Sequence, residues 1–290
     1  MFAFKYRTGG YNLKMTETQK HIISNDGTKI GYRKIGKGEG LIIVHGTGRN
    51  SQSYQKLALA LADNFTVYTY DRRGRGLSGS LTKDHSITKE VEDLVDLSAT
   101  TKAKYIFGHS FGGVISLHAA TRCEINKLAL YEPPISIDNS IPDYWLPEFE
   151  AALSKNEKVR AMTIFLKALP PPDISSFPKW ALTPLVYAVK FMERNKKEES
   201  KMLNLLYTIP PDMRIVKQLE PIVGKYKDMA VPTLLMSGNK SQLFFQQSVK
   251  LLGQLLPTSQ TKIFEDFDHY SPEGKVQEIS KTLTQFYNGN

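Results

Sequence analysis

The sequence predicts an α/β fold in which a mostly parallel central sheet carries helices on both faces and a helical cap insertion. Short continuous apolar runs, such as residues 41–44 and 105–107, are typical of strands buried on both faces of a parallel sheet. Segments with helical spacing of apolar residues separate these runs, and such alternation favours right-handed crossovers within one sheet. From residue 134 to about residue 226 the alternation stops, because helical stretches continue without a buried strand.

The expected elements follow in order along the chain. Residues 21–24 and 29–35 flank a turn that contains Asp26-Gly27, so we expect them to pair as a hairpin. Further strands are expected at 41–44, 65–70, 105–107, 128–131, 233–236 and 261–264. Helices are expected at 53–62, 87–97, 112–120, 244–256 and 275–287.

This order divides the 290 residues into a core with two additions. Residues 21–133 and 227–290 are expected to form the α/β core, and residues 134–226 the helical cap. Residues 1–20 are expected to be a loose N-terminal extension. The chain is long enough for one domain that carries an insertion.

The amino-acid composition limits the classes of function that the protein can have. Hydrophobic residues make up 41% of the chain and charged residues 23%, as in ordinary globular proteins. The net charge of +9 would attract nucleic acid, but no helix-turn-helix, zinc-finger or RNA-binding motif accompanies it, so we expect no nucleic-acid partner. Cys123 is the single cysteine, and no stretch has the length of a membrane span or signal peptide. We therefore expect a cytoplasmic monomer or homodimer without membrane insertion.

The strongest catalytic signal is Ser110 in the string Gly108-His109-Ser110-Phe111-Gly112, between an expected strand and an expected helix. A serine at such a strained turn is raised into the active site, and its neighbours must be small so that strand and helix can approach. The Phe111 N–H at the helix start would stabilise a substrate oxyanion. An ordinary tight turn would explain the glycines alone, but the flanking elements favour a nucleophile.

A second oxyanion donor is expected from the loop His45-Gly46-Thr47-Gly48, which follows the first buried strand. Two N–H groups are needed to hold a tetrahedral oxyanion, and we expect the N–H of Thr47 to be the other one. His45 itself is expected to be a buried, hydrogen-bonded structural residue.

These motifs together resemble the α/β-hydrolase superfamily over nearly the whole chain. More narrowly, Asp71-Arg72-Arg73-Gly74-Arg75-Gly76 and Tyr131-Glu132-Pro133-Pro134 are similar to strings in a group of small bacterial serine hydrolases of unassigned substrate with a helical cap. The resemblance implies an α/β-hydrolase fold and structural arginine–carboxylate pairs in the arginine loop, rather than substrate phosphate contacts.

The resemblance also implies the general base. In the superfamily the base follows the last strand, and His269 follows the expected strand 261–264. A serine hydroxyl needs such a base because it is a poor nucleophile at neutral pH. His109 is expected to face away from the site, and the histidines expected to be structural are His21, His85 and His118.

The acid departs from the usual pattern. The superfamily normally has Gly-x-x-Asp after strand 233–236, whereas this chain has Gly238-Asn239-Lys240-Ser241. Glu132, after strand 128–131, resembles the alternative acid of some members, including certain haloalkane dehalogenases. Glu132 could instead merely terminate its strand, which would leave a Ser110–His269 dyad. Asp266 and Asp268 are weaker alternatives.

The expected reaction is cleavage of a carboxylic ester or lactone of a small hydrophobic substrate through an acyl-enzyme on Ser110. The alternatives are a non-catalytic small-molecule binder on the same fold, or a perhydrolase or C–C bond hydrolase that uses the same serine. No metal-binding, Walker or dinucleotide motif is present, so we expect no metal and no cofactor. The cap is expected to shape the pocket, its aromatic side chains forming the cap's own core or an acyl site: Tyr144, Trp145, Phe149, Phe165, Phe177, Trp180, Tyr187 and Phe191.

Overall fold

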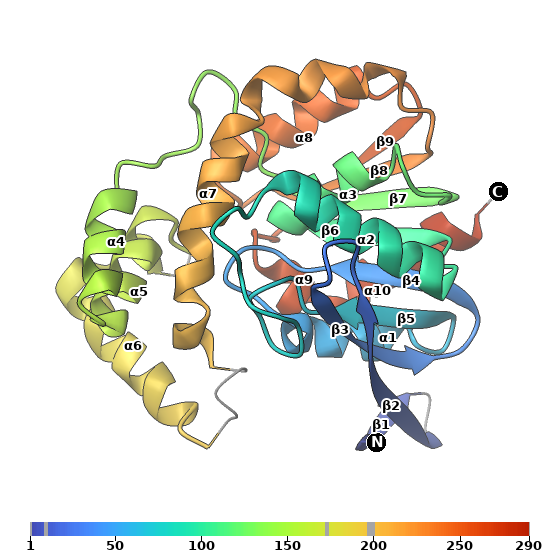
Figure 1. Cartoon of the computed structure of the whole chain (residues 1–290), viewed down its shortest axis with the longest axis horizontal. Helices are drawn as coiled ribbons and strands as arrows, with labels where there is room; N and C mark the ends of the chain where they lie inside the picture. The colour runs from blue at the N-terminus through green and yellow to red at the C-terminus, as the bar shows by residue number, and fades with distance from the viewer. Residues whose placement is uncertain (1, 9–10, 172–173, 196–200, 290) are drawn as a thin grey trace.

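The computed structural model describes residues 2–8, 11–171, 174–195 and 201–289, and these residues contain a nine-stranded sheet (Figure 1). The strand order is β1-β2-β3-β5-β4-β6-β7-β8-β9. The first three pairings in this order are antiparallel and the five from β5 to β9 are parallel. The strands are β1 (Phe2–Thr8), β2 (Tyr11–Ile23), β3 (Lys29–Gly36), β4 (Glu39–Val44), β5 (Phe65–Tyr70), β6 (Tyr105–His109), β7 (Lys127–Tyr131), β8 (Thr233–Gly238) and β9 (Ser259–Phe264).

The helices confirm the alternation that the sequence predicts. All expected core strands and helices are present with their ends shifted by a few residues, except that the expected strand 21–24 is the end of β2, which begins at Tyr11. The α-helices are α1 (Gln55–Leu61), α2 (Ile87–Thr101), α3 (Phe111–Ala119), α4 (Leu146–Ser154), α5 (Lys158–Ala168), α6 (Lys179–Met192), α7 (Ile209–Gln218), α8 (Leu243–Leu255), α9 (Ser271–Gly274) and α10 (Val276–Asn288). Short 3-10 helices lie at η1 (Ser51–Tyr54), η4 (Met202–Asn204), η5 (Leu206–Thr208) and η6 (Glu220–Asp228).

Burial on both faces explains why the central strands are continuously apolar. In β4, Ile42 and Val44 pack into the cluster under α2, α3 and α8. Leu41 and Ile43 face the opposite cluster under α1 and α10. Because successive side chains of a strand point to opposite faces, a strand between two helical layers needs apolar residues at every position.

The N-terminal segment differs from the expected loose extension. Residues 2–8 form β1 and residues 11–20 form the first part of β2, which runs to Ile23. These strands pair with each other, and β2 continues the sheet beside β3. Glu17 is buried and forms an ion pair with Arg33 of β3 at 3.1 Å, which ties the segment to the core. Residues 1, 9 and 10 of the expected extension lie outside the described residues.

A cap-like helical insertion, α4 to α7, lies to one side of the sheet, with α7 nearest the core (Figure 1). Its own core contains Trp145, Phe149, Met162 and Val186, so the insertion buries a separate apolar cluster. Phe165 packs partly buried against this cluster. The other expected cap aromatics are largely exposed: Tyr144, Phe177, Trp180, Tyr187 and Phe191. Among the described residues, no helix has both the length and the apolar character required to cross a membrane.

Candidate active site

Ser110 sits at a sharp turn between β6 and α3. Its φ of 54° and ψ of −130° are strained for a residue with a side chain. The neighbouring backbone leaves no room for side chains, since a Cβ on Gly112 would lie 2.2 Å from the carbonyl oxygen of Val44. A Cβ on Gly108 would lie 2.7 Å from Cα of Gly113. The requirement for small residues around the serine is therefore confirmed by the geometry.

The structure brings Glu132 and His269 together. Nδ1 of His269 lies 2.7 Å from Oε2 of Glu132, whose side chain is completely buried at the end of β7. The other carboxylate oxygen accepts hydrogen bonds from the Ser237 hydroxyl and the Gly238 N–H, both at 2.8 Å. Because Glu132 takes up Nδ1, Nε2 is the nitrogen left to serve a nucleophile.

The other possible acids lie elsewhere. Ser241, at the usual acid position, is buried, and its hydroxyl has no hydrogen-bond partner within the described part of the chain. Asp266 is paired with Lys240 at 2.7 Å. Asp268 accepts hydrogen bonds from the N–H of Tyr270 and the hydroxyl of Ser271. Of these candidates in the described residues, Glu132 is the one whose carboxylate contacts the His269 imidazole.

His109 does not face away from the site as expected. Its Nε2–H donates to the carbonyl oxygen of His269 at 2.7 Å, and Nδ1 accepts a hydrogen bond from the Tyr54 hydroxyl. Burial lowers the pKa of His109 well below its ordinary value, which keeps the ring neutral. The two-residue period of β6 could have revealed this orientation, because His109 shares a face with Phe107.

Phe245 also contacts His269, a contact that the sequence did not predict. Its ring stacks on the His269 imidazole with centroids 3.7 Å apart and planes 7° from parallel. The imidazole is thus held by stacking on one face, by Glu132 at Nδ1 and through its backbone by His109. A single phenylalanine near the start of α8 carries no sequence signal for this role.

The two residues expected to supply oxyanion donors are Phe111, which directly follows Ser110, and Thr47. Phe111 is the first residue of α3, so its N–H has no acceptor within the helix. Thr47 lines the same cavity as Ser110 and His269. His45 is structural, as expected: Nδ1 donates to the Gly46 carbonyl at 3.0 Å and Nε2 accepts the Arg72 N–H at 3.1 Å. Burial lowers the pKa of His45, consistent with this neutral form.

The cavity at Ser110 is small and mostly apolar. Its volume is about 60 Å³, and core and cap both contribute to its wall. Two hydrogen bonds hold the cap segment that follows α5 over it: the Tyr270 hydroxyl to the Leu169 carbonyl at 3.3 Å, and Gln242 Nε2 to the Pro170 carbonyl at 2.8 Å. The cap side chains that line the cavity are Phe165, Leu169, Met213 and Val216.

The arginine loop forms structural ion pairs, as expected. Arg72 binds Glu90 of α2 at 2.7 Å and Asp212 of α7 at 2.8 Å, and Arg75 also binds Asp212 at 2.8 Å. All four side chains are completely buried. The guanidinium of Arg72 also lies 4.5 Å from the ring centre of Phe111. This cluster joins the cap to the core directly behind the nucleophile helix.

The same cluster contains the one grouping of His, Asp and Glu, in the described residues, with spacing suited to a metal ion. His85, Glu90 and Asp212 offer ligand atoms within 4.8 Å of one another. The carboxylate oxygens already accept hydrogen bonds from Arg72 and Arg75. A cation there would have to displace two guanidinium groups, so the donor set fits an ion-pair cluster better than a metal site.

A family comparison agrees with this geometry. The model of the family described as "Serine aminopeptidase, S33" matches residues 39–271, which include the elbow, Glu132 and His269. The chain belongs to this S33 family. Its fold is that of the α/β hydrolases, and a solved "alpha/beta hydrolase from Sphaerobacter thermophilus" shares 28% identity with it. That comparison covers 93% of this chain and 100% of the other, with a TM-score of 0.74.

Two curated relatives of this S33 member are lipases. "Lipase 1" of Psychrobacter immobilis is 25% identical over 281 residues, which cover 92% of this chain and 83% of the lipase. "Lipase 3" of a Moraxella species is 24% identical over 264 residues, covering 87% of this chain and 78% of the lipase. By distant homology the chain is a hydrolase of the lipase and esterase kind.

Proposed function

We propose that the protein is a serine esterase in which Ser110, His269 and Glu132 form the catalytic triad. The observation that carries the proposal is the 2.7 Å contact between His269 and the buried Glu132, beside a cavity that Ser110 also lines. A carboxylate that orients the imidazole and stabilises its charged form is what a serine nucleophile requires from a third member. Glu132 supplies it from β7 instead of the usual position after β8.

The reaction proceeds in two acyl-transfer steps. The Ser110 oxygen attacks the ester carbonyl while Nε2 of His269 takes its proton, and Glu132 stabilises the resulting imidazolium. The N–H groups of Thr47 and Phe111 hold the oxyanion, and each such donor contributes about 3 kcal/mol to transition-state stabilisation. His269 then protonates the leaving alcohol. Water, deprotonated by His269, releases the carboxylic acid and restores the serine.

The cavity favours a short, uncharged acyl group. Its volume of about 60 Å³ is well below the roughly 150 Å³ of an engineered cavity that holds benzene. Its cationic group, Arg49, is already paired with Glu273 at 2.8 Å, so a substrate carboxylate would have to compete for it. Acetyl or propionyl esters and small lactones fit these limits, and the lipase names of the two relatives support ester cleavage.

A fluorophosphonate probe tests the proposal. The intact protein is expected to gain one adduct, located at Ser110 by peptide mass spectrometry, and to lose p-nitrophenyl acetate hydrolysis in the same proportion. Ser110→Ala should gain none, whereas Ser116→Ala, the control on the buried side of α3, should be labelled normally. Binding of esters without turnover and without labelling would favour a non-catalytic binder instead.

A further inference from the structure

The helix α6 exposes an apolar face that no described part of the chain covers. It buries Leu182 and Val186 in the cap, and the opposite side also carries large apolar side chains. We call this side the α6 face, and its large members have these exposed fractions: Trp180 78%, Met192 68%, Phe191 65%, Tyr187 56% and Leu185 42%. Pro184 and Ala188, also exposed, lie between them.

The pattern is unusual for a surface helix. Such a helix normally has an apolar stripe toward the core and polar residues outside, whereas the α6 face contains no charged residue. Trp180, Tyr187 and Phe191 recur at helical spacing on the side away from Leu182 and Val186. Five of the eleven large exposed hydrophobics in the described residues lie on this one helix. A contiguous exposed apolar surface of this kind marks an interaction site.

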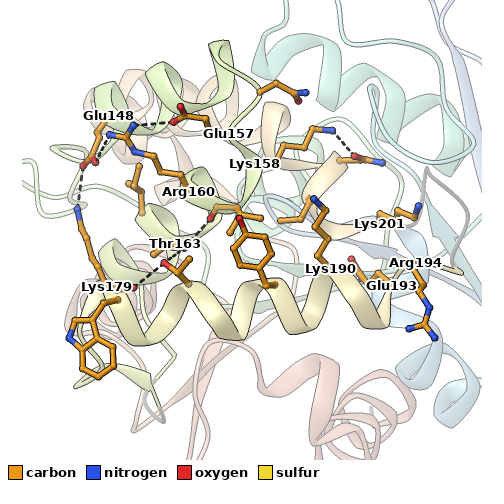
Figure 2. Close-up of a pocket in the computed structure, with 18 residues that line it drawn as sticks. Glu148, Glu157, Lys158, Arg160, Thr163, Lys179, Lys190, Glu193, Arg194 and Lys201 are labelled. Atoms are coloured by element: carbon orange, nitrogen blue, oxygen red, sulfur yellow. Dashed lines mark hydrogen bonds and ion pairs between the residues drawn. The ribbon is translucent and has the colours of Figure 1, made fainter.

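Cationic side chains border the α6 face. A groove of about 1070 Å³ runs along α6 and includes Trp180 and Tyr187 in its wall (Figure 2). Figure 2 labels its charged residues, three carboxylates and these six cations: Lys158, Arg160, Lys179, Lys190, Arg194 and Lys201. The guanidinium of Arg194 lies 3.9 Å from the ring centre of Phe191, so charge and apolar surface are in direct contact.

We propose that the α6 face docks the protein on an anionic lipid surface. Aromatic residues on one side of a helix with cations along its edge are typical of helices that lie in the plane of a membrane interface. The long Lys190 side chain can reach the headgroups while Trp180 and Phe191 enter the acyl boundary. Lys179 would first have to leave its ion pair with Glu148 at 3.4 Å. A second copy of the chain docked on the α6 face would place its own cations against the cations that border this face, so like charges would repel. The net charge of +9 also favours an anionic partner.

The tryptophans provide a direct readout. The chain has two: Trp145 is buried and donates its Nε1–H to the Pro142 carbonyl, whereas Trp180 is exposed. In the Trp145→Phe variant all tryptophan emission comes from Trp180. Vesicles of phosphatidylcholine with phosphatidylglycerol should shift this emission to shorter wavelength. Vesicles of phosphatidylcholine alone should need a several-fold higher lipid concentration for the same shift.

Sedimentation of the unmodified protein with the same vesicles gives an independent measurement. The double variant Trp180→Ser/Phe191→Ser should partition at least tenfold more weakly, since two large side chains no longer enter the lipid. Lys190→Gln should weaken binding to the anionic vesicles about fivefold. Ile263→Ser, which changes an apolar residue on β9 that is 53% exposed, should bind like the parent.

Two outcomes would overturn the proposal. One is unchanged Trp180 emission together with protein that stays in the supernatant with anionic vesicles. The other is a concentration-dependent dimer in lipid-free sedimentation velocity that the Trp180→Ser/Phe191→Ser double variant abolishes. That result would assign the α6 face to a second copy of the chain. Neither outcome bears on labelling of Ser110, so the docking and esterase proposals fail separately.

Discussion

In the core, hydrogen bonds hold the side chains of Glu132, His109 and His269 in place, whereas the cap presents apolar side chains to the cavity and, on α6, to solvent. Glu132 makes three hydrogen bonds, and His269 is held by Glu132, His109 and Phe245. The cap meets the cavity mainly through side chains such as Phe165 and Met213. The difference fits the proposal that the core carries the chemistry and that the cap selects the substrate.

The largest effect is expected from the base itself. His269→Ala removes the proton acceptor of Ser110 and leaves Glu132 buried without its partner, so kcat/KM for p-nitrophenyl acetate should fall about 10⁴-fold. Steady-state kinetics with active-site titration measures it. His21→Ala, a change of an exposed histidine in β2, is the control and should keep full activity. A fall in kcat/KM of tenfold or less in the His269 variant would show that His269 is not the general base.

The join between core and cap is expected to matter for stability. Asp212→Asn leaves two buried arginines short of a charge, and should lower the free energy of unfolding by about 3 kcal/mol. Urea unfolding measures it. The control Asp143→Asn breaks an exposed ion pair with Lys217 between the loop before α4 and α7, and should cost less than about 1 kcal/mol. Equal losses of unfolding free energy in the two variants would show that the buried cluster stabilises the fold no more than an exposed ion pair does.

The difference in the free energy of unfolding between the parent and Asp212→Asn should depend on pH. Burial alone would raise the pKa of Asp212, but Arg72 and Arg75 together hold it well below its ordinary value of 3.8. A lowered pKa means that the unfolded state takes up the proton first, so the contribution is complete above about pH 4 and declines as the pH falls further. The gap between parent and Asp212→Asn should therefore be constant from pH 7 to pH 5, and narrow below pH 4.

A smaller effect is expected at His109, which acts through the backbone of His269. His109→Phe leaves the His269 carbonyl and the Tyr54 hydroxyl without their partner, so kcat should fall about tenfold with little change in KM. His109→Gln, which can still donate and accept, should recover part of the loss. His118→Phe is the matched control, since His118 lies on α3 outside the cavity lining and bonds to Tyr226 of η6. An equal loss of kcat in both variants would indicate a purely structural role.

The smallest effect is expected in the cap. Phe165→Ala enlarges the small cavity, so kcat/KM for hexanoate relative to acetate esters should rise several-fold. Phe177→Ala, an exposed cap residue outside the cavity, should leave the ratio unchanged. An unchanged ratio in the Phe165 variant would place the acyl site elsewhere.

Most of the core could be predicted from the sequence because local signals act there. Continuous apolar runs reveal strands buried on both faces, and the glycines around Ser110 reveal the backbone crowding at the turn. Strand β1 and residues 11–20 of β2 could not be predicted, since this part of β2 is stabilised by partners outside its own segment, such as Arg33. Contacts on His269 from Phe245 and His109 likewise depend on tertiary packing, which leaves no pattern along the chain.

The resemblance alone did not decide whether Glu132 is the triad acid or whether Ser110 and His269 form a dyad without an acid. The usual position holds Ser241, and only the folded sheet, in which β8 lies between β7 and β9, places Glu132 after β7 against His269 in the loop after β9. Both acidic alternatives near His269 in the sequence have other partners, Lys240 for Asp266 and Ser271 for Asp268. Distance along the chain was therefore a poor guide to the residue that contacts the imidazole.

The role of Glu132 as the triad acid is tested by comparing kcat for p-nitrophenyl acetate between Glu132→Gln and Ser241→Ala. Glutamine keeps the size of the side chain but cannot stabilise the imidazolium, so kcat should fall about 10³-fold while fluorophosphonate labelling of Ser110 slows in parallel. Ser241→Ala should retain kcat within about twofold. An unchanged kcat in Glu132→Gln, or a large loss of kcat in Ser241→Ala, would show that Glu132 is not the triad acid.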